Sequence, residues 1–169
     1  MALLAGAGLY WWFSGGAERS FLALAERGKD ALSRVETVPS GGTGHFEPGQ
    51  PYFYSDAFPT SGPHDPGWTE PGFYDEPRSP TRLVHALEHG NIVIYYQKPA
   101  PEVLETLKRW PGIYDGQWAG IVVTPKSGLG ETVVLTAWTR VLRLKPFEPE
   151  AAAAFIDAFR GRGPERPVR

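Results

Sequence analysis

The chain has 169 residues, of which 17 are basic and 19 acidic, and its formal net charge is −2. Because no basic patch stands out, the sequence gives no support for a nucleic-acid partner. Cysteine is absent, so disulfides and thiolate metal sites are excluded. An apolar share of 41% with six tryptophans is typical of one folded domain with a sizeable core.

The N-terminal segment "MALLAGAGLYWWFSGGA", residues 1–17, is apolar and uncharged. It is shorter than the roughly 20 residues of a spanning helix and lacks the basic start of a signal peptide. It fits a signal-anchor that begins further upstream, an atypical signal peptide, or an apolar end that packs on the body. Tyr10, Trp11 and Trp12 suit a membrane interface. We therefore expect a membrane anchor, with the body outside the cytoplasmic membrane, in the periplasm or at the cell surface.

Residues 18–42 are expected to form a helical stalk and a linker between the anchor and the body. Apolar residues, among them Phe21, Leu24 and Val35, recur there at roughly helical spacing. Gly28 weakens the middle of this predicted helix.

A long segment that follows combines many prolines with many aromatic residues. Nine of the 17 prolines fall between residues 39 and 80, at positions 39, 48, 51, 59, 63, 66, 71, 77 and 80. Disordered linkers avoid aromatic residues, whereas this segment contains Phe46, Tyr52, Phe53, Tyr54, Phe58, Trp68, Phe73 and Tyr74. We expect residues 43–78 to form an ordered loop, pinned to the body by its rings, and loops of this length are often functional.

The rest of the chain alternates between helical and strand patterns. The expected elements are a helix between Ser79 and Gly90, a doubly covered strand at 91–98, a helix at 101–110, a hairpin of strands at 119–125 and 131–144, and a closing helix at 149–160. Residues 161–169 read as a frayed basic tail. Without regular βαβ repeats, the pattern predicts an α+β fold: a single compact domain over residues 43–160, with a small, mainly antiparallel sheet and flanking helices.

The expected helix carries "HALEHG" at residues 85–90. His85 and His89 are four residues apart, so their imidazoles point the same way from a helix. Leu83 and Leu87 share nearly the opposite face. We expect the leucines to face the core and the imidazoles to meet the proline-rich loop.

All four histidines lie in one 45-residue window, since His45 and His64 are on the loop. Prolines on both sides of His64 limit how far its ring can move. Three or four imidazoles can bind copper or zinc, with Glu88, Asp65 or a tyrosine as a further ligand. The alternative is that the histidines only brace the loop.

The string H-x-x-E-H at residues 85–89 is also the motif of one class of zinc peptidases, with Glu88 as the general base. That chemistry needs a third protein ligand, and the acidic candidates near the C-terminus are Glu150, Asp157 and Glu165. Glu165 falls in the expected tail and Asp157 on the expected solvent face. A short helix in a small chain also leaves little room for a substrate cleft, so this is the weaker reading.

The segments "GHFEPG", "PTSGPH", "GFYDEP", "VHALEHG" and "LTAWTRVL" resemble the motifs of a bacterial family known only as domain of unknown function 3105. The resemblance spans about residues 43–160. Departures are Phe58, where a second proline is usual, and Ala86, where serine is common. The resemblance implies an α+β domain, often behind an N-terminal anchor, and no established activity. The recurrent histidines of that family fall on His45, His64, His85 and His89.

The leading hypothesis is a membrane-anchored extracytoplasmic domain whose histidines bind copper or zinc, copper being favoured, in metal handling or in support of a membrane complex. The first alternative is a non-enzymatic accessory subunit of such a complex with purely structural histidines. The second is a small metallohydrolase. A binding or accessory role is expected rather than an enzyme.

Overall fold

The computed structural model describes the backbone of residues 3–47 and 50–169, and the side chains of residues 15–47 and 50–169. The side chains of Tyr10, Trp11 and Trp12, and all of Pro48, lie outside these ranges. The helices are α1 (Leu3–Arg27), α2 (Pro80–Glu88), α3 (Pro101–Arg109) and α4 (Pro149–Phe159), with 3-10 helices η1 (Lys29–Arg34) and η2 (Trp110–Gly112). The strands are β1 (Glu36–Thr37), β2 (Gly72–Phe73), β3 (Ile92–Tyr96), β4 (Ile121–Pro125), β5 (Val133–Ala137) and β6 (Arg140–Leu144).

The strands form one six-stranded sheet in the order β1-β6-β5-β3-β4-β2. Strand β3 is central and entirely buried, as its apolar run predicts. It pairs antiparallel with β5 and parallel with β4, and the edge strand β2 is also parallel to β4. The other pairings, β1 with β6 and β6 with β5, are antiparallel. The predicted single domain of mixed helices and strands is confirmed, with a mixed sheet.

The predicted hairpin of 119–125 with 131–144 is wrong, because β4 and β5 flank β3 on opposite sides instead of pairing with each other. The segment 131–144 is itself a hairpin of β5 and β6. Its turn passes through Thr139, which has a left-handed φ of 58°. The apolar run of β3 explains the arrangement, since a strand of this kind needs a neighbour on both edges and cover on both faces.

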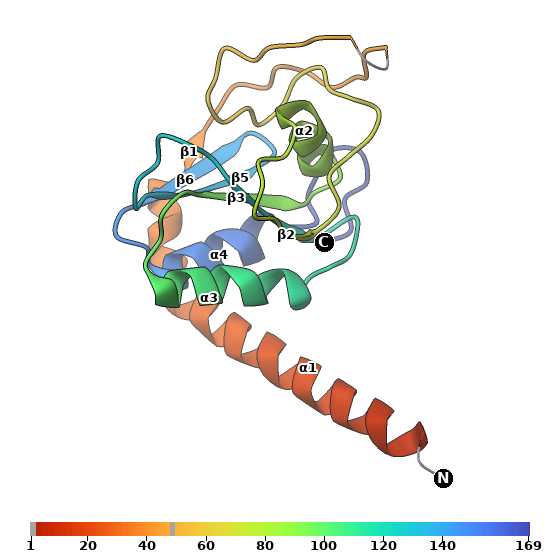
Figure 1. The fold of residues 1–169 in the computed structure, drawn as a ribbon, viewed down its shortest axis with the longest axis vertical. Helices are drawn as coiled ribbons and strands as arrows, with labels where there is room; N and C mark the ends of the chain where they lie inside the picture. Colours follow the sequence, from red (N-terminus) through yellow and green to blue (C-terminus); the bar gives the residue numbers. More distant parts are fainter. Residues whose placement is uncertain (1–2, 48–49) are drawn as a thin grey trace.

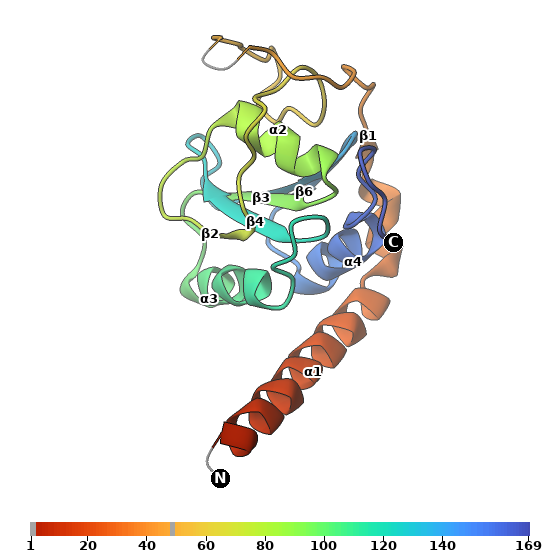
Figure 2. The same ribbon diagram turned by 90° about the vertical axis from the view of Figure 1, so that its right-hand side faces the viewer.

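Helices cover the two faces of the sheet unequally (Figures 1 and 2). Alternate residues of β3 point to opposite faces, so Ile92 and Ile94 belong to one core cluster and Val93 and Tyr95 to another. The first cluster is closed by α1, α3 and α4. The second is closed by α2, over which the proline-rich loop runs. The histidine helix is therefore sandwiched between sheet and loop.

Helix α1 contains residues 3–17 of the expected anchor and residues 18–27 of the expected stalk, whereas the rest of the stalk includes η1 and β1. The C-terminal part of α1 enters the core instead of standing apart from the body. Phe21 is 1% exposed and meets the rings of Trp110 and Tyr114 edge-on, at centroid distances of 5.5 and 5.2 Å. The helix ends at Arg27, earlier than its apolar spacing predicts. Gly28 follows directly, and only glycine fits there, because a Cβ would lie 1.9 Å from the backbone oxygen of Glu150 at the start of α4.

Among the residues that the structure describes, no helix is both long and apolar enough to cross a membrane. Most of the anchor expected at residues 1–17 lies at positions whose side chains are outside the described ranges, so the anchor stays a prediction.

The proline-rich loop packs most of its aromatic rings on the body, with two exceptions. Phe58 and Tyr74 pack against the core cluster beneath α2, and Phe73 stacks on Tyr96 at 5.5 Å. Tyr52 and Phe53 are 38% and 90% exposed, so the expectation that the loop rings pack on the body is wrong for these two. No described residue covers the ring of Phe53.

Replacing Phe21 by alanine is expected to lower the free energy of unfolding by about 3–5 kcal/mol, because it removes a fully buried ring and leaves a cavity. Its neighbour Leu22 is 40% exposed on the same helix, so Leu22→Ala is the matched control and should cost under about 1 kcal/mol. Urea unfolding of the two variants measures both. Equal losses would contradict the packing of α1 into the core.

Candidate metal centre

Helix α2 is buried on both sides from Leu83 to Glu88, so its histidines lie in the interior of the protein. Pro80 occupies the first helical position, and the helix ends at Glu88, with His89 as its C-cap and Gly90, which has a φ of 95°, after it. As expected, Leu83 and Leu87 lie in the core beneath the helix. The imidazoles on the other side are not in water, because His85 and His89 are only 3% and 2% exposed.

Backbone pairing within the loop brings the other two histidines together. His64 donates its amide to the oxygen of Gly44 at 3.0 Å, and its own oxygen accepts the amide of Phe46 at 3.1 Å. The two stretches thus run side by side as a short parallel bridge between His45 and His64. Their ring centroids are 5.0 Å apart, and each ring lies within 4.9 Å of the His85 ring.

Backbone carbonyls fix which nitrogen of two imidazoles carries hydrogen. His64 Nδ1 lies 2.8 Å from the oxygen of Gly62, and His85 Nδ1 lies 2.9 Å from the oxygen of Asp65. A carbonyl oxygen only accepts, so both Nδ1 atoms donate. In the neutral rings the lone pairs are therefore on Nε2. Metal-binding histidines are held in the same way, with the other ring nitrogen donating to a carbonyl or carboxylate.

A first group of donors consists of His45, His64, His85 and Glu88, with one ligand atom from each lying within 4.8 Å of every other. His64 is fully buried, Glu88 is 7% exposed, and His45 is on the surface. Two donors bound to one ion at about 2.1 Å can be at most about 4.2 Å apart. Four donors arranged tetrahedrally around one ion are about 3.4 Å apart, so a shared ion requires some of them to approach one another by up to about 1.4 Å.

The contact between His64 and Glu88 is the most unusual feature of this group. His64 Nε2 lies 2.9 Å from a carboxylate oxygen of Glu88, yet it makes no hydrogen bond within the described structure. With hydrogen on Nδ1, a neutral His64 has no hydrogen on Nε2 to donate to the nearby oxygen, which itself carries only lone pairs. The two atoms repel each other unless a proton or a metal cation lies between them.

A second group consists of His85, His89 and Glu165. A carboxylate oxygen of Glu165 lies 3.1 Å from His89 Nε2 and 4.0 Å from His85 Nε2. The His89 ring is also flanked by Trp118 and Trp68, at centroid distances of 4.4 and 5.0 Å. His85 is the member that the two groups have in common.

Glu165 is the residue that sequence reasoning set aside, because the expectation of a frayed tail is wrong. The amide of Gly161 donates to the oxygen of Gly90 at 2.7 Å, so the tail returns to the end of α2. A Cβ on Gly163 would lie 2.1 Å from the oxygen of Glu88, a contact that only glycine permits. Glycines on both sides of this contact, at 90, 161 and 163, were the available sequence signal.

Asp65, expected as a further ligand, belongs to neither group. Its carboxylate accepts the amide of Gly67 at 2.7 Å and lies 3.5 Å from Nε of Arg82. Its contribution comes from the backbone, through the carbonyl that orients His85.

The imidazoles of α2 are held in their neutral form. Burial lowers the pKa of His85, and the nearby imidazoles lower it further. The hydrogen bond to the backbone oxygen of Asp65 acts in the opposite direction, but its effect on the pKa is smaller than that of burial. Burial also lowers the pKa of His89, although the carboxylates of Glu165 and Glu70 oppose this effect. Neutral imidazole is the form that binds metal.

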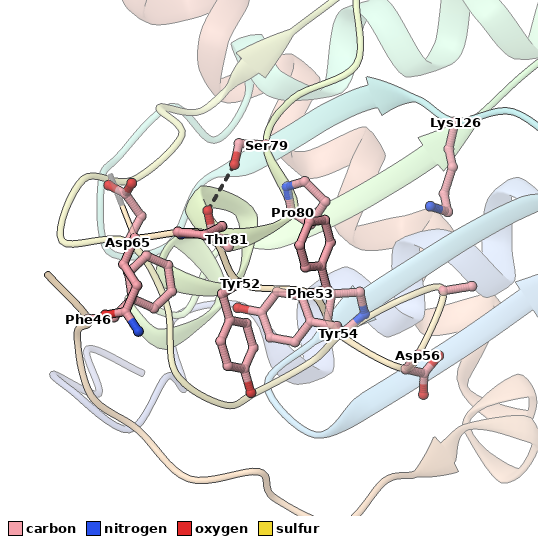
Figure 3. A pocket seen from close by; sticks show the side chains of 14 residues that line it. Phe46, Tyr52, Phe53, Tyr54, Asp56, Asp65, Ser79, Pro80, Thr81 and Lys126 are labelled. Carbon is pink, nitrogen blue, oxygen red and sulfur yellow. Dashed lines mark hydrogen bonds between the residues drawn. The ribbon is translucent and has the colours of Figure 1, made fainter. Parts of the chain in front are cut away.

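A cleft beside the cluster is separate from it. This cleft of about 480 Å³ is lined mainly by loop residues and by the start of α2, with Tyr52 and Tyr54 in the middle and Asp65 and Lys126 towards opposite ends (Figure 3). No histidine lines it. Apart from the exposed His45, the imidazoles are buried, and the cluster is not at the bottom of this cleft.

In metal-free protein, the free energy of unfolding is expected to fall as the pH drops below about 6.5. The native pKa values of His85 and His89 are lowered, so between those values and 6.5 the unfolded chain binds more protons than the native one. Stability therefore rises with pH across this window. Urea unfolding at several pH values measures the slope, which His89→Gln should make shallower. Stability that increases on acidification would contradict the burial of neutral rings.

No curated protein and no solved structure matches the chain significantly. One protein family does match, over residues 45–169, a range that contains every donor of both groups. The family is described as "Protein of unknown function (DUF3105)". Since the match covers most of the chain, this protein belongs to the DUF3105 family.

Proposed function

We propose that this protein is a metal-binding domain that holds a divalent transition-metal ion between the proline-rich loop and α2. The observation that carries the proposal is the facing pair of His64 Nε2 and the Glu88 carboxylate at 2.9 Å, buried and without a hydrogen bond. A cation between them turns a repulsive contact into two ligand bonds. His85, oriented by the oxygen of Asp65, supplies the third bond, and the exposed His45 supplies the fourth.

The alternative of purely structural histidines requires a proton in place of the metal. A proton shared by His64 Nε2 and the Glu88 carboxylate would satisfy that pair alone and would supply nothing to the rings of His85 and His89. A metal ion can be bound by several imidazoles at once, whereas a proton links only one imidazole to the carboxylate. This difference favours the metal.

The donor set favours Zn²⁺ or Cu²⁺. Imidazole suits both ions, and the carboxylate is a common further ligand of zinc. Copper in its reduced state prefers sulfur, and the chain has no cysteine and a single methionine at position 1. We therefore propose that the protein binds Zn²⁺ or Cu²⁺ and not copper in its reduced state.

A metallohydrolase gains one supporting feature, because Glu165 lies where the third ligand of the H-x-x-E-H motif would be needed. Against it, Glu88 faces His64 and is not free to act as a base on water. The described cleft also lacks the histidines, so we do not propose catalysis.

Untagged full-length protein, dialysed against Zn²⁺ or Cu²⁺, is expected to retain one ion per chain by elemental analysis. Glu88→Gln should weaken binding by at least the roughly 10–100-fold that loss of an outer-sphere partner costs. The double variant His85→Ala and His89→Ala should abolish binding while keeping its helical circular dichroism, since Leu83 and Leu87 still anchor α2. Glu131→Gln, which removes a carboxylate from the exposed turn before β5, is the matched control.

Binding should also be lost below about pH 6, as the imidazole ligands take up protons. Folded wild-type protein that retains neither ion at pH 7.5 would rule out the proposed function.

A position outside the cytoplasmic membrane stays a prediction from residues 1–17. Cell fractionation that recovers the full-length protein in the cytosol would contradict it.

A further inference from the structure

The two donor groups around α2 differ in composition but share one residue, His85. Each includes His85, whose Nδ1 is committed to the oxygen of Asp65. Only Nε2 of His85 remains to bind metal, and one lone pair serves one ion at a time. An ion bound through His85 therefore lies either with His45, His64 and Glu88, the inner position, or with His89 and Glu165, the outer position.

The outer position is suited to capture. Its carboxylate, Glu165, is 43% exposed and lies on the C-terminal segment, and Glu70 adds a second carboxylate whose charge acts on His89. Two carboxylates at the surface attract a cation and raise its local concentration. The buried nitrogen His89 Nδ1 has no hydrogen-bond partner in the described residues, so this ring is not committed to a fixed orientation by that atom.

The inner position is suited to retention. It offers four donors instead of three, and two of its imidazoles are fixed by carbonyls of the loop. His64 is fully buried and Glu88 nearly so. A buried site with oriented ligands loses its ion slowly.

We propose that the ion is captured at the outer position and passed to the inner one, with His85 bound throughout. This inference rests on the proposed function and adds a direction to it. In the transfer, the bonds from the ion to Glu165 and His89 break, and bonds to His64, Glu88 and His45 form. The His85 bond is kept, no electron is transferred, and both Nδ1 hydrogens stay in place.

The tryptophans beside His89 make the two steps visible. Cu²⁺ quenches nearby indole fluorescence, and Trp118 lies 4.4 Å from the His89 ring by centroids. In stopped-flow mixing of metal-free, full-length protein with Cu²⁺, wild type should show a fast phase proportional to Cu²⁺ concentration and a slower phase independent of it.

The variants separate the two positions. Glu165→Gln should slow the concentration-dependent phase by about tenfold or more, as expected for loss of electrostatic attraction and a ligand, and leave final affinity close to wild type. Glu88→Gln should keep the fast phase and abolish the slow one. Glu131→Gln should change neither phase.

Native mass spectrometry with Cu²⁺ tests the shared ligand. One ion per chain at saturation is expected, whereas two ions per chain would overturn the proposal. A single phase that Glu165→Gln does not change would overturn it as well, even though Cu²⁺ still binds. Failure of the proposed function is distinct, since it would show no binding in any variant.

Discussion

The arrangement of the whole site depends on one constraint: α2 has a polar face that is kept out of water. Its leucines secure it to the sheet, and the loop and the C-terminal segment close over the opposite side. Polar groups buried in this way must find partners, or the fold loses stability. The carbonyls of Gly62 and Asp65 satisfy one nitrogen each of His64 and His85. The remaining nitrogens face one another and the carboxylate of Glu88.

The proline-rich loop is a structural part of this arrangement. Its backbone pairs with itself near His45 and His64, and it supplies the carbonyls that set the tautomers. Prolines suit such a segment because they reduce the conformational freedom that ordering removes. The rings of Tyr52 and Phe53 line the cleft beside the cluster and stay exposed instead of packing on the body.

Patterns within single elements were readable in the sequence. The apolar run of β3, the proline at the start of α2 and the i, i+4 spacing of His85 and His89 gave correct elements and the correct core face. Long-range contacts were not readable in this way. The placement of β4 and β5 on either side of β3 depends on competition between strands, which no local pattern records. Glu165 was set aside for the same reason, since its position depends on glycine contacts between α2 and the far end of the chain.

The donors come from three stretches that are remote in sequence: the loop, α2 and the C-terminal segment. An ion in the inner position joins the loop to α2, and an ion in the outer position joins α2 to the C-terminal segment. Either ion stabilises the folded chain, because the unfolded chain does not hold the donors together. In chains that contain cysteine, disulfides link remote stretches in a comparable way. This cysteine-free chain would gain a cross-link that forms without an oxidant and is removed by a chelator. Its resistance to unfolding would then follow the supply of metal and not the redox state of its surroundings.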